Sequence, residues 1–279
     1  MAQPSLTALS ITYMKEHGTR PIGVRKLKTN LFQKYPEFIN TDPRVTRTSA
    51  YSVDQRFMQL RHEVMFDFDV VDKRILDLGS CVGATGAWVL EHGAKEYHAV
   101  EFHADLASIS EANLKTYFDQ SRWKVFNMSI DSFLSTNIES YDIVIASGVL
   151  YSFFDPIPFL KKLTSIADIL IIESVHPRQV PELRSDYHLE ETAFIVFNDR
   201  RMMWGANGHE VSYHGSEASL GFLKYFFKLH GFEHEPRCHI QLTLNCPEVY
   251  NRSKRYGARF IKKSNTLTEL GFTETYKND

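Results

Sequence analysis

Between residues 74 and 174, short apolar runs alternate with segments of helical spacing. This alternation is typical of consecutive βαβ units, which build a parallel sheet with helices on both faces. Because the crossovers are right-handed, the carboxyl ends of the strands meet at one edge, and ligands of such sheets bind beyond it. We predict strands at 74–79, 97–102, 123–127, 141–147 and 168–174, and helices at 84–93, 104–118, 131–135 and 156–165.

The flanking segments predict appendages to this unit. Residues 1–70 have helical spacing without a strong strand, and we expect a helical arm or cap there. Its clearest helix, at 52–68, places four apolar residues on one face: Phe57, Leu60, Val64 and Met65. Residues 177–215 are too long for an ordinary connection and predict an insertion or lid after the fifth strand.

The chain after this insertion is expected to complete the sheet. A helix is predicted at 216–230, with Ser216 as its N-cap and Gly231 as its end. Strands at 239–245 and 257–263 read as an antiparallel pair, and 264–279 as a tail. The predicted fold is therefore a doubly wound, Rossmann-like, mostly parallel seven-stranded α/β sheet with an antiparallel closing strand, in a domain at 71–263.

Composition narrows the classes of partner. Apolar residues make up 43% of the chain, enough for one substantial core, and 32 basic residues nearly balance 34 acidic ones. The net charge of the chain is therefore too small to attract polyanions such as nucleic acids. The basic stretches 20–34 and 252–263 are interpreted first as solvated faces. Three widely spaced cysteines fit a reducing compartment, and no apolar run approaches the roughly 18 to 20 residues of a membrane span. We expect a soluble cytoplasmic protein; the sequence does not indicate its oligomeric state.

The sequence LDLGSCVGATG, at 76–86, follows the first predicted strand and opens a helix. Small residues at such a turn let a ligand approach the backbone closely. A dinucleotide fingerprint requires G-x-G-x-x-G, whereas Cys81 occupies the place of the second glycine. This disfavours a diphosphate cradle and with it a nicotinamide-dependent enzyme.

The loop instead resembles the D-x-G-x-G-x-G loop of class I S-adenosylmethionine-dependent methyltransferases, with Asp77, Gly79 and Gly83 matched and Cys81 in place of the middle glycine. The resemblance covers roughly residues 70–175. It implies S-adenosylmethionine as methyl donor, with Ser80 also in the binding loop. The donor is a sulfonium with an ammonium group, and Asp77 supplies a negative charge suited to it.

Other strand ends supply further candidates for the donor site. Glu101, at the end of the second strand, is placed to accept hydrogen bonds from a ribose diol, and Phe102 to lie against adenine. In the third segment, Ser129 stands where the family has an acidic adenine ligand, with Asp131 as a neighbouring substitute, and Ile130 would offer its backbone N–H. Ser147 would border the methyl donor.

The segment ASGVLYSFFDP after the fourth strand resembles the GVLYH segment of tRNA wobble-uridine methoxy-forming transferases and related small-molecule methyltransferases. Tyr151 in this segment could hydrogen-bond the acceptor or the donor's carboxylate. Histidine is the natural base for deprotonating an oxygen or nitrogen acceptor, and the candidates are His176, His209 and His214.

A metal site formed by these histidines with Glu173 matches no known ligand spacing, so we expect no metal. In-line methyl transfer requires neither a metal nor a covalent intermediate, because positioning supplies much of the acceleration.

The predicted function is methyl transfer from S-adenosylmethionine to an oxygen or nitrogen of a small metabolite or natural-product intermediate. One alternative is a tRNA-modifying methyl- or carboxymethyl-transferase; the latter needs a cation cluster for a carboxylated donor. A third alternative is a non-catalytic donor-binding protein; the complete donor loop argues against it, although such a loop indicates binding rather than turnover.

Overall fold

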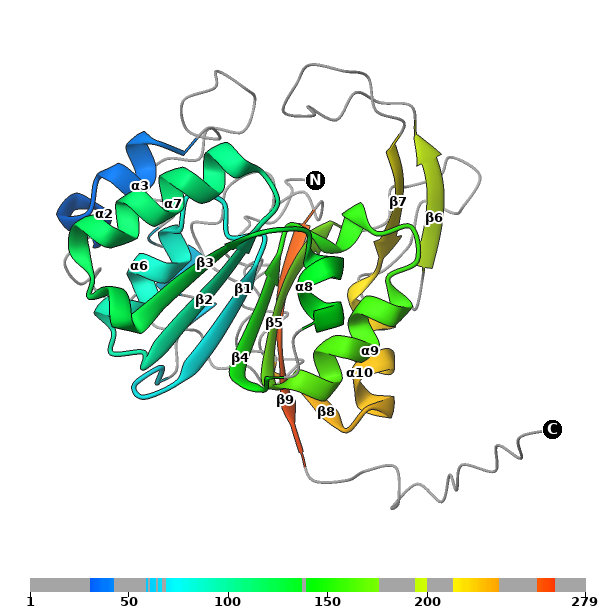
Figure 1. Cartoon of the computed structure of the whole chain (residues 1–279). Helices are drawn as coiled ribbons and strands as arrows, with labels where there is room; N and C mark the ends of the chain where they lie inside the picture. The colour runs from blue at the N-terminus through cyan, green and yellow to red at the C-terminus, as the bar shows by residue number, and fades with distance from the viewer. Residues whose placement is uncertain are drawn as a thin grey trace, which may run out of the picture.

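The computed structural model describes residues 31–42, 59, 61–63, 65–66, 69–136, 139–175, 194–199, 213–235 and 255–263. Its central element is a seven-stranded sheet with the order β3-β2-β1-β4-β5-β9-β8 (Figure 1). β1 to β5 are mutually parallel, and β9 is antiparallel to both of its neighbours. The strands are β1 (Arg74–Leu78), β2 (Glu96–Glu101), β3 (Trp123–Asn127), β4 (Tyr141–Ser147), β5 (Ala167–Val175), β8 (Phe232–Glu235) and β9 (Arg255–Lys262).

Helices cover both faces of this sheet, as Figure 1 shows. The first face carries α2 (Leu31–Lys34), α3 (Glu37–Asn40), α6 (Ala84–Glu91) and α7 (Ala104–Tyr117). The second carries α8 (Ile130–Thr136), α9 (Ile157–Ile166) and α10 (Leu220–Leu229). Two short 3-10 helices, η1 (Gln120–Arg122) and η2 (Leu150–Ser152), lie in the connections before β3 and after β4.

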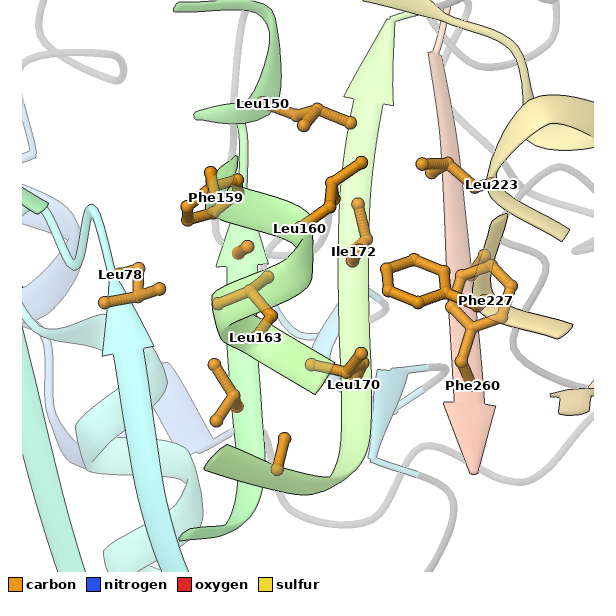
Figure 2. Packing of buried hydrophobic residues seen from close by; sticks show 14 of the residues in the cluster. Leu78, Leu150, Phe159, Leu160, Leu163, Leu170, Ile172, Leu223, Phe227 and Phe260 are labelled. Carbon is orange, nitrogen blue, oxygen red and sulfur yellow. The ribbon is translucent and has the colours of Figure 1, made fainter. Parts of the chain in front are cut away.

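Alternation along the strands divides the interior into two hydrophobic cores. On β1, Ile75 contributes to the core beneath α6 and α7, whereas Leu76 and Leu78 contribute to the core beneath α9 and α10. Figure 2 shows the second core, where Leu160 and Leu163 of α9 lie over β4 and β5 while Phe227 of α10 lies beside Phe260 of β9. Because both faces are covered, the strands read as nearly continuous apolar runs.

The fold class predicted from the sequence is confirmed. β3 and β4 have the predicted bounds; β1 differs from them by one residue at one end, and β2 and β5 by one residue at each end. The four helices between these strands also occur, with ends shifted by up to two residues. The edge formed by the carboxyl ends of β1 to β5 is called the carboxyl edge below.

One prediction for the later chain is wrong, the start of the helix predicted at 216–230. Residues 213–218 form β7 (Tyr213–Ala218), so Ser216 lies in a strand, and α10 begins after Ser219, which caps it. β9 forms ladders with β5 and β8; residues 239–245, the predicted partner of this strand, lie outside the described residues. The C-terminal end of α10 is as expected, because Gly231 follows it with a φ of 79°.

A hairpin begins within the predicted insertion and extends three residues beyond its predicted end. β6 (Phe194–Asp199) pairs antiparallel with β7, and β7 lies beside η2 and β5. Tyr256 at the start of β9 donates a hydrogen bond of 2.8 Å to the carbonyl oxygen of Ala218, the last residue of β7. The hairpin is thereby attached at the carboxyl edge. Among the described residues, no helix has the length and apolar character of a membrane span.

Candidate functional site at the carboxyl edge

The loop between β1 and α6 requires glycine for two physical reasons. Gly79 and Gly83 have φ values of 81° and 83°, in the left-handed region that favours glycine. A Cβ on Gly79 would also lie 2.4 Å from Cγ1 of Val149. The backbone N–H groups of Gly79 and Ser80 both donate to the carbonyl oxygen of Val100, so the loop bends back over the end of β2.

Cys81 and Glu101 join this loop to β2. Cys81 has a φ of 53°, so the position where the family loop has its middle glycine does adopt a glycine-like conformation. Its backbone N–H donates to Oε2 of Glu101 at 2.8 Å, while the N–H of His103 donates to Oε1 at 3.0 Å. Glu101 is buried, and each carboxylate oxygen retains acceptor capacity. The carboxylate is therefore held in a fixed orientation at the end of β2.

Asp77 is held by a residue that sequence reasoning missed. The hydroxyl of Tyr97, a fully buried residue of β2, donates to Oδ2 of Asp77 at 2.8 Å. Burial, followed by the charge of Asp77, raises the pKa of Tyr97 well above its ordinary value. A Cβ on Gly86 would lie 2.4 Å from Cε1 of the same ring. The last glycine of the loop therefore makes room for the tyrosine that fixes the aspartate.

The ends of β2 and β3 expose apolar side chains. Phe102 is 68% exposed and Met128 is 37% exposed, whereas the side-chain amide of Asn127 donates to the carbonyl oxygens of Glu101 and Phe102. Ser129 Oγ accepts from the N–H of Ser132 at 3.1 Å, which satisfies the first turn of α8. Ile130, the first residue of α8, packs against the second core. The predicted adenine-side residues therefore lie at neighbouring strand ends.

The ends of β4 and β5 carry a polar group. Ser147 Oγ donates to Oε2 of Glu173 at 2.9 Å, and Arg61 of the N-terminal segment contacts both residues. Tyr151 lies in η2, and a Cβ on Gly148 would be 3.5 Å from its hydroxyl oxygen. The structure thus places Ser147 and Tyr151 at the carboxyl edge. Arg61 was not anticipated, because no local pattern marks it.

The histidine candidates are only partly placed. His214 lies in β7, opposite Asn198 of β6, and β7 runs beside the η2 helix that carries Tyr151. His176 and His209 lie outside the described residues. Within the described part of the chain, no group of three or more histidine, cysteine or carboxylate residues is arranged to hold a metal ion.

The described side chains at the carboxyl edge are mainly acidic. Asp105 and Asp131 lie in the first turns of α7 and α8, and Asp155 accepts a hydrogen bond from the N–H of Ile157 at the start of α9. The buried carboxylates Asp77, Glu101 and Glu173 lie at the ends of β1, β2 and β5. Arg61 opposes these charges, and Glu173 pairs with it at 2.7 Å.

The arrangement has features that fit an adenosyl sulfonium. A buried carboxylate with oriented oxygens lies beside two exposed apolar side chains, and acidic groups suit a ligand with an ammonium group and a positive sulfur. In the loop, Ser80 Oγ is buried and has no hydrogen-bond partner within the described structure. The glycine loop supplies close backbone approach without a diphosphate fingerprint.

Comparison with solved structures supports the fold. The N-terminal domain of EvdMO1 with bound S-adenosylhomocysteine (SAH) has a TM-score of 0.53 and 13% identity, covering 86% of this chain and 99% of that one. The DhpI-SAM-HEP complex has a TM-score of 0.53 and 10% identity, covering 84% and 98%. A Listeria monocytogenes protein assigned as an S-adenosylmethionine-dependent methyltransferase has a TM-score of 0.51 and 16% identity, covering 72% and 96%.

Models of known protein families and the sequences of curated proteins give no match to the chain. At such low identities, the structural likeness establishes the fold, which is that of class I S-adenosylmethionine-dependent methyltransferases.

Proposed function

We propose that the protein transfers a methyl group from S-adenosylmethionine to an oxygen or nitrogen atom of a small metabolite or natural-product intermediate. The observation that carries this proposal is the buried carboxylate of Glu101, oriented by the N–H groups of Cys81 and His103 beside the glycine loop. A carboxylate held in this way is suited to accept two hydrogen bonds from a diol. The shared fold is consistent with this proposal.

The remaining residues would hold the donor by complementary chemistry. Gly79 and Gly83 let the backbone approach it, and Asp77 provides negative charge for its ammonium group. Phe102 and Met128 would cover an apolar ring, since exposed apolar side chains at a strand edge gain by being covered. Ser129, Ile130 and Ser147 remain candidates, although the Ser129 and Ser147 hydroxyls are already hydrogen-bonded within the protein.

The donor, when bound, supplies an electrophilic methyl group. The protein would align an acceptor atom with it and, for an acceptor that carries a proton, remove that proton. Tyr151 at the end of β4 is the candidate for orienting the acceptor. His214, on the strand beside it, and His176, just beyond β5, are the candidate bases because imidazole titrates near neutral pH.

Charge at the carboxyl edge favours a neutral or cationic acceptor over RNA. The described carboxylates there outnumber the basic side chains, and the guanidinium of Arg61 is paired with Glu173. A polyanion gains affinity by contacting free cations, and its approach to an acidic edge is unfavourable. The same charge disfavours a carboxylated donor.

Calorimetric titration with SAH tests the donor assignment. We expect binding by the wild-type protein and at least roughly tenfold weaker binding by Glu101→Gln, which cannot accept two hydrogen bonds with a full negative charge. Glu96→Gln is the matched control, because Glu96 begins the same strand at the opposite edge. Absence of SAH binding at millimolar concentration, or equal affinity in all three proteins, contradicts the proposal.

Turnover and acceptor class need separate measurements. Formation of SAH from S-adenosylmethionine in the presence of candidate small acceptors distinguishes an enzyme from a donor-binding protein. A titration with tRNA at low ionic strength should show no binding. Tight, salt-sensitive tRNA binding would instead support an RNA-modifying enzyme.

A further inference from the structure

A buried polar cluster joins the N-terminal segment to the carboxyl edge. Arg61 and Glu173 are 8% and 2% exposed, and Arg61 Nε donates to Glu173 Oε2 at 2.7 Å. A second guanidinium nitrogen of Arg61 donates to Ser147 Oγ, and that hydroxyl donates to the same carboxylate oxygen. The planar guanidinium group therefore engages two strand ends at once, which an ammonium group does not reproduce.

Stability alone is a weak reason for such a cluster. Desolvating two charges is unfavourable, and well-packed apolar residues often replace a buried ion pair without loss of stability. A hydrogen-bonded pair differs from apolar packing because its geometry is directional. The cluster is therefore better explained by the position that it imposes on its neighbours.

Those neighbours are the residues that lead from β4 into η2. The N–H of Gly148 donates to the carbonyl oxygen of Glu173 at 2.9 Å. The side chain of Val149 fills the space in front of Gly79, and the hydroxyl of Tyr151 lies over Gly148. The segment 148–151 thus lies between the cluster and the glycine loop, and it carries the candidate acceptor-side residue.

Strand order indicates which part of a ligand this segment would face. β1 lies between β2 and β4. If Glu101 at the end of β2 holds the sugar, and Phe102 and Met128 hold the base, the rest of the donor extends over β1 toward β4. The segment 148–151 would therefore border the amino-acid half of the donor and the acceptor, but not the nucleoside.

From this geometry we infer that Arg61 is a positioning residue, which acts through Ser147 and Glu173 to set the segment 148–151 and the hydroxyl of Tyr151. The inference rests on the proposed function for the identity of the ligand. It assigns to the N-terminal segment a direct part in shaping the donor and acceptor side of the site.

The experiment compares two ligands on the full-length chain. SAH carries both halves of the donor, whereas adenosine carries the nucleoside alone. The variants are Arg61→Lys and the double variant Arg61→Met/Glu173→Met, which removes both charges of the pair together. Arg74→Lys is the control, because Arg74 pairs with Glu96 and Glu139 at the opposite edge of the sheet.

A second measurement follows Tyr151 directly and needs no ligand. Fluorotyrosine labelling gives an NMR signal for Tyr151, and the Tyr151→Phe variant assigns it.

We expect Arg61→Lys and the double variant to weaken SAH binding by roughly tenfold and adenosine binding by less than about twofold. Both should also shift the Tyr151 signal, and Arg74→Lys should do neither. An equal loss for the two ligands, or no change for either with an unshifted Tyr151 signal, overturns the inference. If the wild-type protein binds neither ligand, the proposed function fails. The NMR signal of Tyr151 in Arg61→Lys still tests the positioning role in that case. A shifted signal supports this role, and an unshifted signal refutes it.

Discussion

Tyr97 connects two features that the sequence shows separately, the aspartate at the start of the glycine-rich segment and the glycine at its end. Its hydroxyl holds Asp77, and its ring occupies the space in front of Gly86. Asp77 can therefore keep a fixed orientation at a buried position. A residue on β2 thus shares in shaping a loop that belongs to β1.

Replacing Tyr97 by phenylalanine tests this connection. Tyr97→Phe removes one hydrogen bond to a buried carboxylate and should lower the free energy of unfolding by about 1 to 3 kcal/mol. It should also weaken SAH binding, because Asp77 loses part of its orientation. Urea unfolding and calorimetry measure the two effects. Tyr225→Phe, at a residue that is 59% exposed, should change neither the free energy of unfolding nor the affinity for SAH. If Tyr97→Phe also leaves both unchanged, the role of Tyr97 is contradicted.

Gly79 combines two separable constraints. In Gly79→Ala, the new Cβ meets Val149 and the residue keeps a φ of 81°. We expect a loss of roughly 2 to 4 kcal/mol in the free energy of unfolding, from overlap and left-handed strain together. The same substitution is then made in a Val149→Ala background, where the overlap is absent. The loss of stability due to Gly79→Ala should be smaller in that background than in the wild-type protein, but not zero. No loss in that background would show that the backbone conformation carries no cost.

Prediction from sequence succeeds at residue scale where the signal is local. The sequence predicts Gly79 and Gly83 in the loop between the first strand and its helix, and Glu101 at the end of the second strand, and the structure has them at those places. Tyr97 and Arg61 act through contacts with residues distant in sequence, at separations of 20 and 86 or more. Their neighbours in the chain do not reveal such contacts, so sequence reasoning missed both.

At the scale of elements, the start of α10 shows how a strong local pattern can be misplaced. Ser216 and Ser219 both precede the apolar run of this helix, and both are good N-cap residues. Pairing of β7 with β6 extends the strand through Ala218, so the helix begins later. Ser219 Oγ then accepts from the N–H of Phe222 at 3.0 Å.

The cap gives a prediction for this element. Ser219→Ala should lower the free energy of unfolding by about 0.5 to 2 kcal/mol, because the first turn loses a partly buried hydrogen bond. Ser216→Ala, in the strand, is the comparison and should have the smaller effect in chemical unfolding. A larger loss of stability in Ser216→Ala than in Ser219→Ala would indicate that Ser216 is the N-cap, as predicted from the sequence.

β1 to β5 are predictable because strands buried on both faces are continuous apolar runs bounded by turns. β8 is different: the sequence of Phe232–Glu235 is FEHE, four residues with alternating polarity and no local feature that separates them from a loop. Its assignment depends on the ladder to β9, which lies more than twenty residues away. The hairpin of β6 and β7 also depends on pairing between segments that are not adjacent in the chain.

At the scale of the whole molecule, the two edges of the sheet have different polar chemistry. The carboxyl edge carries the candidate site, whereas the opposite edge carries a chain of polar contacts. The hydroxyl of Tyr141 lies 2.9 Å from Nδ1 of His98, and Nε2 of His98 lies 2.9 Å from Oε1 of Glu96, which also pairs with Arg74. Glu96 and His98 also line a cavity of about 360 Å³, which reaches as far as Met128 after β3.

This histidine makes the stability of the fold depend on pH. Burial lowers the pKa of His98 below its ordinary value, although the neighbouring Glu96 opposes the shift. Near pH 6.5 and below, the unfolded chain therefore takes up a proton that the folded protein takes up less readily. Protonation thus favours unfolding, and the contribution of His98 to stability is greatest above this range and is lost as the pH falls through it.

The expected result is a smaller free energy of unfolding at pH 5.5 than at pH 7.5, a range that stays above the ordinary pKa values of carboxyl groups. His98→Gln keeps a side chain capable of hydrogen bonding but cannot titrate, so urea unfolding of this variant should show a weaker pH dependence. The pH dependence of unfolding in His98→Gln is compared with that in His230→Gln, because burial also lowers the pKa of His230. An unchanged pH dependence in His98→Gln would mean that other groups carry it and that the polar chain at this edge does not couple protonation to the fold.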